Sequence, residues 1–381
     1  MKRTIAIAIN TSWNIYNFRL GLLKALQNDG YNIVIVAPHD DYSEKLEALG
    51  FEYHNIGINN KGTNPLEDAK LVLDFYKCYK RIAPDVVLHY TIKPNIYGSM
   101  AAGMLGIPVI ANISGLGTVF LNNSISSKIA RGLYKVSLKI PQKVFFQNRH
   151  DRELFIRSHL VKETKTDILP GSGIDTERFK PLKEKKETGD SIKFLFIARL
   201  VKDKGLVEFV EAARKTKKQS TVNHLPSTEF HILGAYYPGN PTAITEEEMQ
   251  QWEEEGIVTY LGTSDDVKSV IANYDCIVLP SYREGLSRVL LEAASMEKPI
   301  ITTNVPGCQE VVEDGLNGYL CNVKDADSLA DQMKKIMALS NKERREMGRK
   351  GREKVVKEFD ERLVIGKYKE AIKYLLGEAN A

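Results

Sequence analysis

Short apolar segments typical of buried strands alternate with helical patterns along nearly the whole chain, in two successive series. The expected strands are 4–9, 32–37, 85–90, 108–113, 143–147 and 166–169, then 192–198, 229–233, 257–261, 275–279, 299–302 and 318–321. The expected helices are 18–28, 65–81, 95–105 and 126–139, then 205–218, 243–254, 267–272, 286–296, 326–338, 342–358 and 361–376. Because alternating strands and helices build a parallel sheet covered on both faces, the chain is predicted to form two Rossmann-like α/β domains.

The join between the two series is expected between Pro170 and Gly189. It begins with Pro170-Gly171-Ser172-Gly173, which breaks regular structure, and continues with a highly charged stretch. We therefore predict an N-terminal domain at 1–170, a second domain at 190–358, and a last helix within 359–381 that packs back on the first domain. Ligands of open α/β sheets bind beyond the carboxyl ends of the strands, so two facing domains would enclose one cleft.

Composition and length place the protein in solution or at a membrane surface. The 381 residues suffice for two cores at an apolar fraction of 43%, and no apolar stretch approaches the roughly 20 residues of a membrane span. The first apolar stretch is too short for a signal peptide. Four cysteines without Cys-x-x-Cys spacing are expected to be free thiols in a reducing cytoplasm.

The net charge of +4 hides an asymmetry. Residues 1–180 hold 23 Lys and Arg against 16 Asp and Glu, a balance of +7, whereas the rest of the chain holds 30 against 33. No acid occurs between Val86 and His150, a span that carries seven Lys and Arg residues. Such a span suits a polyanionic surface or ligand.

Two glutamates, Glu284 and Glu292, flank a predicted passage from strand to helix. Glu284 falls in a glycine-containing turn and Glu292 lies on the helix that follows, roughly 12 Å of helical rise away. The two acids can grip hydroxyls at two ends of one ligand. Backbone N–H groups near Leu286 and Ser287 can bind an anion between them, which is the outline of a nucleotide sugar. The alternative is an exposed turn acid and a helical acid favoured by the dipole.

Two cations, Arg199 and Lys204, follow the strand 192–198 and precede a predicted helix. Cations at the carboxyl end of a strand suit a diphosphate, and their charge would stabilise a departing nucleoside diphosphate. The alternative is a solvated Arg and Lys on a loop.

With these residues the chain resembles glycosyltransferase family 4, the retaining GT-B enzymes of bacterial polysaccharide and lipid-linked glycan assembly. The likeness covers almost the whole chain and is most specific between 194 and 320. It is carried by Ala198-Arg199-Leu200-Val201-Lys202-Asp203-Lys204-Gly205, Leu279-Pro280-Ser281-Tyr282-Arg283-Glu284-Gly285, the Glu292 helix, Pro306-Gly307-Cys308-Gln309-Glu310-Val311-Val312, Asp314-Gly315-Leu316-Asn317-Gly318 and Gly171-Ser172-Gly173-Ile174-Asp175.

The resemblance implies roles for the second-domain residues. Arg199 and Lys204 would hold the donor diphosphate, Glu292 the ribose hydroxyls, and Glu284 the donor sugar, so that Glu284, Arg199 and Lys204 form the catalytic set. The remaining donor-binding residues would be Gly234, Tyr260, Leu261, Gly285, Leu286 and Ser287. The resemblance also implies retention of anomeric configuration, with the leaving diphosphate helping to deprotonate the acceptor.

The first domain departs from the family pattern, and we expect Asn14, Arg19, Lys93 and Gly115 to contact the acceptor. A glycine-rich loop after the first strand is replaced by the segment 10–19, and His89 is predicted to lie inside a strand instead of at its end. Each choice has an alternative. Arg19 can be a helix-surface charge, Lys93 a solvated lysine at a helix start, and the segment Gly115-Leu116-Gly117-Thr118 a simple turn.

Residues 125–140 form a predicted amphipathic helix with a basic face, Lys128, Arg131, Lys135 and Lys139. Ile125, Ile129, Leu133, Val136 and Ile140 form the adjoining apolar face. The helix either packs on its sheet as a surface helix or lies near anionic lipid headgroups and a lipid diphosphate acceptor.

No metal or other cofactor is expected. The sequence has no His-x-x-x-His pair, and no Gly-x-x-x-x-Gly-Lys phosphate loop. Asp325-Ala326-Asp327 matches a metal-binding Asp-x-Asp, but it precedes a predicted helix, where N-capping is the expected role.

Together with these features, the resemblance to glycosyltransferase family 4 implies a hexosyltransferase that moves a hexose or N-acetylhexosamine, with retention, from a UDP-linked donor. The acceptor would be a glycan or an undecaprenyl-diphosphate-linked saccharide of a bacterial surface polysaccharide, capsule or glycoprotein. The enzyme would be cytoplasmic, attached peripherally to the inner membrane face, with no nucleic-acid partner. The rivals are a UDP-sugar epimerase of GT-B-like fold and a non-catalytic nucleotide- or glycan-binding module.

Overall fold

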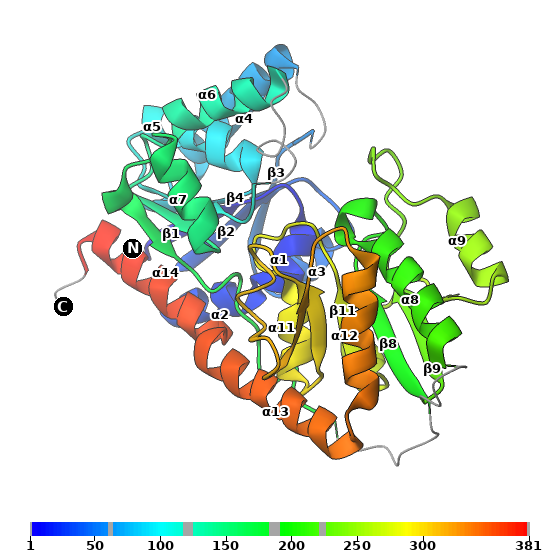
Figure 1. The fold of residues 1–381 in the computed structure, drawn as a ribbon. Coiled ribbons are helices and arrows are strands. Elements are labelled where there is room, and N and C mark those ends of the chain that lie inside the picture. The colour runs from blue at the N-terminus through cyan, green and yellow to red at the C-terminus, as the bar shows by residue number, and fades with distance from the viewer. Residues whose placement is uncertain (1, 60–63, 117–124, 183–190, 221–225, 379–381) are drawn as a thin grey trace. The chain divides into compact units, whose positions relative to one another are not determined.

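The computed structural model describes residues 2–59, 64–116, 125–182, 191–220 and 226–378. The chain divides into two compact units, one formed by Met1–Gly173 with Glu361–Ala381 and the other by Ile174–Asp360. Each unit is built on one parallel sheet flanked by helices (Figure 1).

The described part of the first unit holds a seven-stranded sheet in the order β3-β2-β1-β4-β5-β6-β7, with every pair parallel. Its strands are β1 (Thr4–Ala8), β2 (Asn32–Ala37), β3 (Glu52–Asn55), β4 (Val86–Tyr90), β5 (Val109–Ile113), β6 (Lys143–Phe146) and β7 (Thr166–Ile168). Its helices are α1 (Ser12–Phe18), α2 (Leu20–Asn28), α3 (Ser43–Ala48), α4 (Pro65–Ile82), the π-helix η1 (Pro94–Gly98), α5 (Ser99–Met104), α6 (Ile125–Ser137), α7 (Arg149–Arg157), the short 3₁₀ helix Glu163–Lys165 and α14 (Glu361–Leu376).

Helices cover both faces of this sheet because successive side chains of a strand point to opposite faces. Ala6 and Ala8 of β1 pack in a core with residues of α4, α5, α6 and α7. Ile5 and Ile7 pack on the other face with α2, α3 and α14. The terminal helix α14 buries Val364, Tyr368 and Ile372, and so belongs to the core of the first unit.

The second unit repeats the plan, with a six-stranded parallel sheet in the order β10-β9-β8-β11-β12-β13 among the described residues. Its strands are β8 (Ile192–Ile197), β9 (Thr228–Leu233), β10 (Thr259–Tyr260), β11 (Cys276–Leu279), β12 (Ile300–Thr303) and β13 (Gly318–Cys321). Its helices are the 3₁₀ helix η4 (Lys202–Lys204), α8 (Leu206–Ser220), α9 (Glu246–Glu254), α10 (Val267–Ala272), α11 (Arg288–Ser295), α12 (Ala326–Ala338) and α13 (Asn341–Glu358). The strand order reverses between β1 and β4 in the first sheet and between β8 and β11 in the second. In Rossmann-like sheets, ligands bind at the carboxyl ends of the strands at this point of reversal.

The predicted strands are all present, with ends that differ by at most two residues, and the prediction of two Rossmann-like sheets is confirmed. Four elements were missed. Strand β3 is a polar edge strand without an apolar run, α1 and α3 span less than two and a half turns each, and α7 depends on the side chain of Asn148 as its N-cap. The helix predicted at 18–28 is present as α2, which begins two residues later than predicted because the chain leaves helical geometry at Arg19.

The predicted break after Pro170 is present, with Gly171 and Gly173 both at positive φ. The charged remainder of the predicted join, 183–189, lies outside the described residues. The four cysteines are buried and unpaired, as expected from their spacing. Among the described residues, no helix has the length and apolar character needed to cross a membrane.

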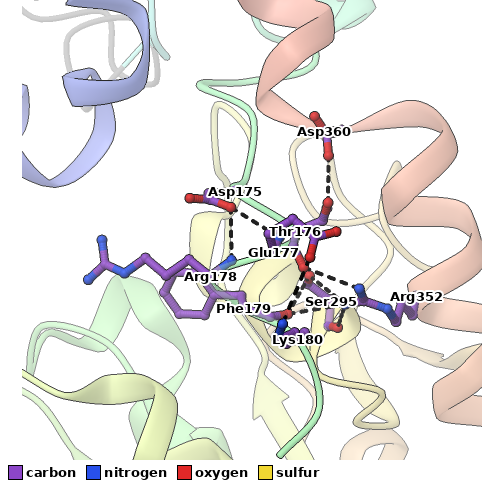
Figure 2. A network of polar contacts seen from close by, with 9 residues as sticks. All are labelled: Asp175, Thr176, Glu177, Arg178, Phe179, Lys180, Ser295, Arg352 and Asp360. Atoms are coloured by element: carbon purple, nitrogen blue, oxygen red, sulfur yellow. Dashed lines mark hydrogen bonds and ion pairs between the residues drawn. The ribbon is translucent and has the colours of Figure 1, made fainter. Parts of the chain in front are cut away.

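Arg352 of α13 forms hydrogen bonds both with the first residues of the second unit and with α11 (Figure 2). Its guanidinium donates to the carbonyl oxygens of Thr176, at 3.2 Å, and Phe179, at 3.3 Å, and to that of Ser295. The Ser295 hydroxyl donates to the same Phe179 carbonyl at 2.7 Å, and the Thr176 hydroxyl donates to Asp360 at 2.5 Å. One side chain therefore satisfies carbonyls from two distant segments.

We expect Arg352→Ala to lower the free energy of unfolding of the second unit by about 3 kcal/mol, because several partly buried carbonyls lose their donor together. Urea unfolding followed by Trp252 fluorescence in a Trp13→Phe background reports on this unit alone. Arg349→Ala is the matched control, since among the described residues Arg349 forms ion pairs only with Glu346 and Glu353 of its own helix. An unchanged midpoint for the Arg352 variant would show that the network contributes nothing to stability.

Candidate functional site

The predicted site residues of the second unit lie where β8, β9, β10 and β11 end. Arg199 follows β8, Lys204 is the last residue of η4, and Glu284 lies in the loop after β11. Because β8 pairs with both β9 and β11, residues that follow these strands meet at one edge of the sheet.

Lys204 and Glu284, eighty positions apart, form an ion pair. The exposed fractions of their side chains are 18% and 15%. The loop after β11 is tied to η4 by the Tyr282 N–H, which donates to the Asp203 carbonyl at 2.9 Å. The structure thus brings together the cation and the acid that the sequence singled out separately.

Gly307 supports the backbone of Glu284 from the loop after β12. A Cβ at this position would lie 2.3 Å from the Glu284 carbonyl oxygen, and the φ of +85° also favours glycine. The Glu284 N–H donates to the Pro306 carbonyl at 3.1 Å, and the Ser287 N–H donates to the Gly307 carbonyl at 2.9 Å. The predicted anion site near Leu286 and Ser287 therefore needs correction, because the Ser287 N–H is already bonded and α11 begins only at Arg288.

Glu292 lies on α11 and is almost fully buried, with 8% of its surface exposed. Its Oε1 accepts a hydrogen bond from Nε of Arg288, one helical turn earlier, at 3.1 Å. Burial raises the pKa of the Glu292 carboxyl above its ordinary value, and the charge and hydrogen bond of Arg288 act against this shift. No hydrogen bond or ion pair joins Glu292 to Glu284 or Lys204.

Arg199 projects over the ring of Tyr237, with its guanidinium carbon 4.7 Å from the ring centroid. Within the described residues it makes no ion pair with either glutamate. Two cations and two acids were predicted to converge. Among the described residues, the structure shows a contact within this set only between Lys204 and Glu284.

Gly234 directly follows β9, Tyr260 is the last residue of β10, and Leu261 follows it. The Tyr260 hydroxyl donates to the Gly234 carbonyl at 2.8 Å, and the Gly234 N–H donates to the Gly262 carbonyl at 2.9 Å. Gly234 also leaves no room for a side chain, since its Cβ would stand 1.7 Å from the Ala198 carbonyl oxygen. Leu261 is 39% exposed. Gly285, which follows Glu284, is half-buried.

In the first unit, Lys93 forms a largely buried ion pair with Asp68. Its Nζ lies 2.8 Å from Oδ1 of Asp68, and the side chains are 14% and 16% exposed. The second Asp68 oxygen accepts the Tyr97 hydroxyl at 2.7 Å. The solvated-lysine alternative is wrong.

The other predicted acceptor residues lie after β1 and β5. Asn14 is on α1, and its buried Oδ1 has no hydrogen-bond partner among the residues that the structure describes. Arg19 is only 5% exposed, so the alternative of a helix-surface charge is wrong. Gly115 has a φ of 144°. Gly117 and Thr118, which belong to the same predicted segment, lie outside the described residues.

His89 lies inside β4, as predicted, and is completely buried. Its ring nitrogens bond the Tyr79 hydroxyl at 2.8 Å and the Ser99 hydroxyl at 3.0 Å. Burial lowers the pKa of His89 to about 3, so the ring is neutral at physiological pH. This histidine is a core residue, and no part of the candidate site is built on it.

The predicted apolar face of α6 does not coincide with its buried face. Ile129 and Val136 are 58% and 56% exposed, whereas Tyr134 and Leu138 are buried. The exposed stripe of the helix combines these two aliphatic residues with Lys128 and Lys135, and the exposed Lys139 follows in the turn after the helix ends at Ser137. The side chain of Ile125 lies outside the described residues.

Asp325 is the N-cap of α12, as predicted, because its side chain accepts the Ser328 N–H at 2.8 Å. Asp327 pairs with Lys215.

Three contact residues were missed by sequence reasoning. Arg288 was detectable, since it stands four residues before Glu292 on one helix, a spacing typical of side-chain pairs. Asp68 and Tyr237 gave no such signal, because each meets its partner across at least 25 positions of chain.

Two family sequence models match the chain. "Glycosyl transferase 4-like" matches residues 4–148, and "Glycosyl transferases group 1" matches residues 177–354. The protein belongs to glycosyltransferase family 4. The predicted enzyme class is thereby confirmed, and it sets aside the epimerase and the non-catalytic binding module.

Curated relatives of this glycosyltransferase align over most of both chains. A Campylobacter jejuni protein, N,N'-diacetylbacillosaminyl-diphospho-undecaprenol alpha-1,3-N-acetylgalactosaminyltransferase, is 28% identical over 339 residues, which cover 85% of this chain and 86% of the relative. An Escherichia coli protein, UDP-Gal:alpha-D-GlcNAc-diphosphoundecaprenol alpha-1,3-galactosyltransferase, is 27% identical over 308 residues, or 77% and 76% of the two chains.

Solved structures show the same fold. A glycosyltransferase from Rickettsia africae has a TM-score of 0.78 at 18% identity and covers 100% of both chains. Anabaena HepE in complex with UDP and glucose has a TM-score of 0.78 at 16% identity and covers 97% of this glycosyltransferase and 99% of HepE. The predicted GT-B fold is confirmed.

Proposed function

We propose that this glycosyltransferase moves a hexose or N-acetylhexosamine, with retention, from a UDP-linked donor to a saccharide on undecaprenyl diphosphate or to a related glycan. The product would belong to a bacterial surface polysaccharide, such as a capsule, or to a glycoprotein glycan. The observation that carries the proposal is the Lys204–Glu284 ion pair at the carboxyl edge of the second sheet. The two bacterial relatives are named for transfer to undecaprenyl-diphosphate-linked saccharides, and this supports the acceptor class.

The ion pair suits a site that is empty until the donor arrives. Each charge satisfies the other while no ligand is present, which avoids an unpaired and largely buried charge. When the donor enters, Lys204 turns to the diphosphate and Glu284 accepts hydroxyls of the donor sugar. The exchange leaves both charges compensated, one by phosphate oxygens and the other by hydrogen-bond donors.

In the transfer step, the bond between the anomeric carbon and the diphosphate oxygen breaks and a bond to the acceptor oxygen forms. Lys204 and Arg199 stabilise the negative charge that develops on the departing UDP. The leaving diphosphate accepts the proton of the acceptor hydroxyl. Arg199 needs no carboxylate partner for this role, since the Tyr237 ring holds its guanidinium in place.

The remaining donor contacts follow from the positions described above. Glu292 would bind the ribose hydroxyls, and Arg288 opposes the rise in the pKa of this carboxyl that burial causes. Backbone groups at Gly285, Leu286 and the start of α11 would lie along the phosphates. Gly234, Tyr260 and Leu261 would line the base.

On the acceptor side we propose Asn14, Arg19, Lys93 and Gly115. Lys93 reaches a ligand only by leaving Asp68, as Lys204 leaves Glu284. We further propose that no metal ion takes part, which is tested by unchanged transfer in the presence of EDTA.

Two measurements test the proposed function. A panel of UDP- and GDP-sugars is screened for thermal stabilisation, and a cognate donor at 100 times its Kd is expected to add about 2.7 kcal/mol to the free energy of unfolding. Products are then analysed by NMR with donor alone and with donor plus a polyprenyl-diphosphate saccharide. Transfer only in the second mixture, with the donor's anomeric configuration kept, is the expected result. Conversion of the donor to an epimer without acceptor would contradict the proposal.

We also propose that the enzyme acts in the cytoplasm at the inner membrane face, with α6 as its membrane contact. The exposed stripe of α6 alternates lysines with Ile129 and Val136, which suits a helix lying in the headgroup region. Residues 86–150 contain no Asp or Glu, so this span carries no side-chain charge that would repel anionic lipid.

Replacing Lys128, Arg131 and Lys135 together with glutamine is expected to weaken binding to anionic liposomes about 10²-fold, since each basic residue contributes about 1 kcal/mol near such a surface. Flotation measures the bound fraction. Replacement of Lys342, Arg345 and Lys357 on α13 removes the same charges elsewhere and serves as the control. Absence of binding by the wild type, or equal loss in both triple variants, would rule out α6 as the contact.

A further inference from the structure

Arg19 is a buried cation that has no counter-charge in the part of the chain that the structure describes. It stands between α1 and α2, where its backbone leaves helical geometry, and only 5% of its surface is exposed. Its side chain makes no ion pair and no hydrogen bond within the described residues, and its buried Nε has no acceptor. Folded proteins seldom bury an arginine in this way, because a charge removed from water without a partner destabilises the fold.

One contact of Arg19 is aromatic. Its guanidinium carbon lies 4.3 Å from the centroid of the Tyr90 ring, which supplies a cation–π interaction. Tyr90 packs in turn beside Tyr368 of α14, whose hydroxyl accepts the Asn112 side chain at 2.9 Å. The ring orients the guanidinium and offsets part of its desolvation. It does not provide the oxygen acceptors that five N–H donors require.

Arg19 lies where ligand-binding residues of such a sheet are expected. Tyr90 is the last residue of β4, and Asn112 is the penultimate residue of β5, so both lie at the carboxyl edge of the first sheet. Two further buried polar atoms have no partner among the described residues and belong to segments that follow β1 and β4: Asn14 Oδ1 on α1 and Asn95 Oδ1 on η1. Thr91, directly after β4, has a φ of +65°, and such strain is found most often at functional sites.

We propose that Arg19 binds a phosphoryl oxygen of the acceptor's diphosphate and that the Tyr90 hydroxyl donates a second hydrogen bond to it. Burial raises the pKa of Tyr90, so this hydroxyl stays protonated and can donate. The inference rests on the proposed function, because it assigns the phosphorylated part of the acceptor to a named group. Arg19 would then recognise an acceptor by its diphosphate, independently of the sugar attached to it.

The test compares two acceptors that carry the same saccharide, one on a short polyprenyl diphosphate and one on a neutral alkyl chain. With Arg19→Gln we expect the KM of the diphosphate acceptor to rise 10- to 100-fold, while the KM of the UDP-sugar and kcat/KM for the neutral acceptor stay unchanged. Arg19→Lys should recover part of the loss. Lys24→Gln, which removes an exposed charge from α2, should leave the KM and kcat/KM of both acceptors unchanged.

A measurement on the wild type covers the case in which Arg19→Gln does not fold. At saturating UDP-sugar, inorganic pyrophosphate should compete with the diphosphate acceptor and not with the neutral one. Equal loss on both acceptors in Arg19→Gln, or no competition in the wild type, overturns the inference. A raised KM for the UDP-sugar would assign Arg19 to the donor instead. If UDP-sugar is bound or hydrolysed and neither acceptor is used, the proposed acceptor class fails, separately from Arg19.

Discussion

Purified Lys204→Ala is expected to transfer sugar with a kcat/KM about 10²- to 10³-fold below that of the wild type. The lysine is proposed to stabilise charge on the leaving diphosphate, and loss of one such donor typically costs about 2.7–4 kcal/mol of transition-state stabilisation. The effect should appear in kcat as well as in KM, because charge on the diphosphate grows as the bond to the sugar breaks.

Lys202→Ala is the matched control for this variant. Lys202 lies in the same 3₁₀ helix, but its side chain is 48% exposed and its Nζ is 3.4 Å from Glu248 at the surface. Both variants should remain folded, since β8 and α8 keep their contacts on either side of η4. Equal activity of Lys204→Ala and the wild type in steady-state kinetics would remove this lysine from the mechanism.

Glu284→Gln is expected to lower kcat/KM by a similar factor, about 10²- to 10³-fold, for a different reason. The carboxylate is proposed to accept hydroxyls of the donor sugar, and charged acceptors make hydrogen bonds roughly twice as strong as neutral ones. Such contacts position the anomeric carbon, where small errors are costly. Glu313→Gln, at an exposed carboxylate that pairs with Lys354, should leave transfer unchanged.

The two variants should differ in their affinity for UDP itself. Removing the Glu284 charge frees Lys204 from its ion pair, so UDP should bind Glu284→Gln at least as tightly as the wild type. Removing Lys204 should weaken UDP binding. A Glu284 variant that loses UDP affinity to the same extent as the Lys204 variant would mean that the carboxylate acts on the nucleotide and not on the sugar.

Much of the fold was predictable because strands buried on both faces leave long apolar runs. Strand β1, with Ile5 and Ile7 on one face and Ala6 and Ala8 on the other, is a clear case. Strand β3 was missed because an edge strand needs no such run, and its sequence Glu-Tyr-His-Asn is mostly polar. The break at Arg19 was missed because neither glycine nor proline marks it.

The site was predictable in its residue types and less so in its contacts. Strand and helix order placed Lys204 and Glu284 at adjacent strand ends, which was enough to expect them together. Pairings that depend on side-chain direction could not be predicted from the sequence. Examples are the ion pair of Lys93 with Asp68 and the position of Arg199 over the Tyr237 ring. The burial of Arg19 was also hidden, since its sequence context is equally compatible with a surface helix.

Calorimetric titration of UDP and of the cognate UDP-sugar into the wild type, Lys204→Ala and Glu284→Gln tests the central claim most directly. If the ion pair opens to hold a donor, Lys204→Ala loses affinity for both ligands. Glu284→Gln keeps its affinity for UDP and loses only the increment that the sugar adds. Unchanged binding of both ligands in both variants would contradict the assignment of this pair as the donor site.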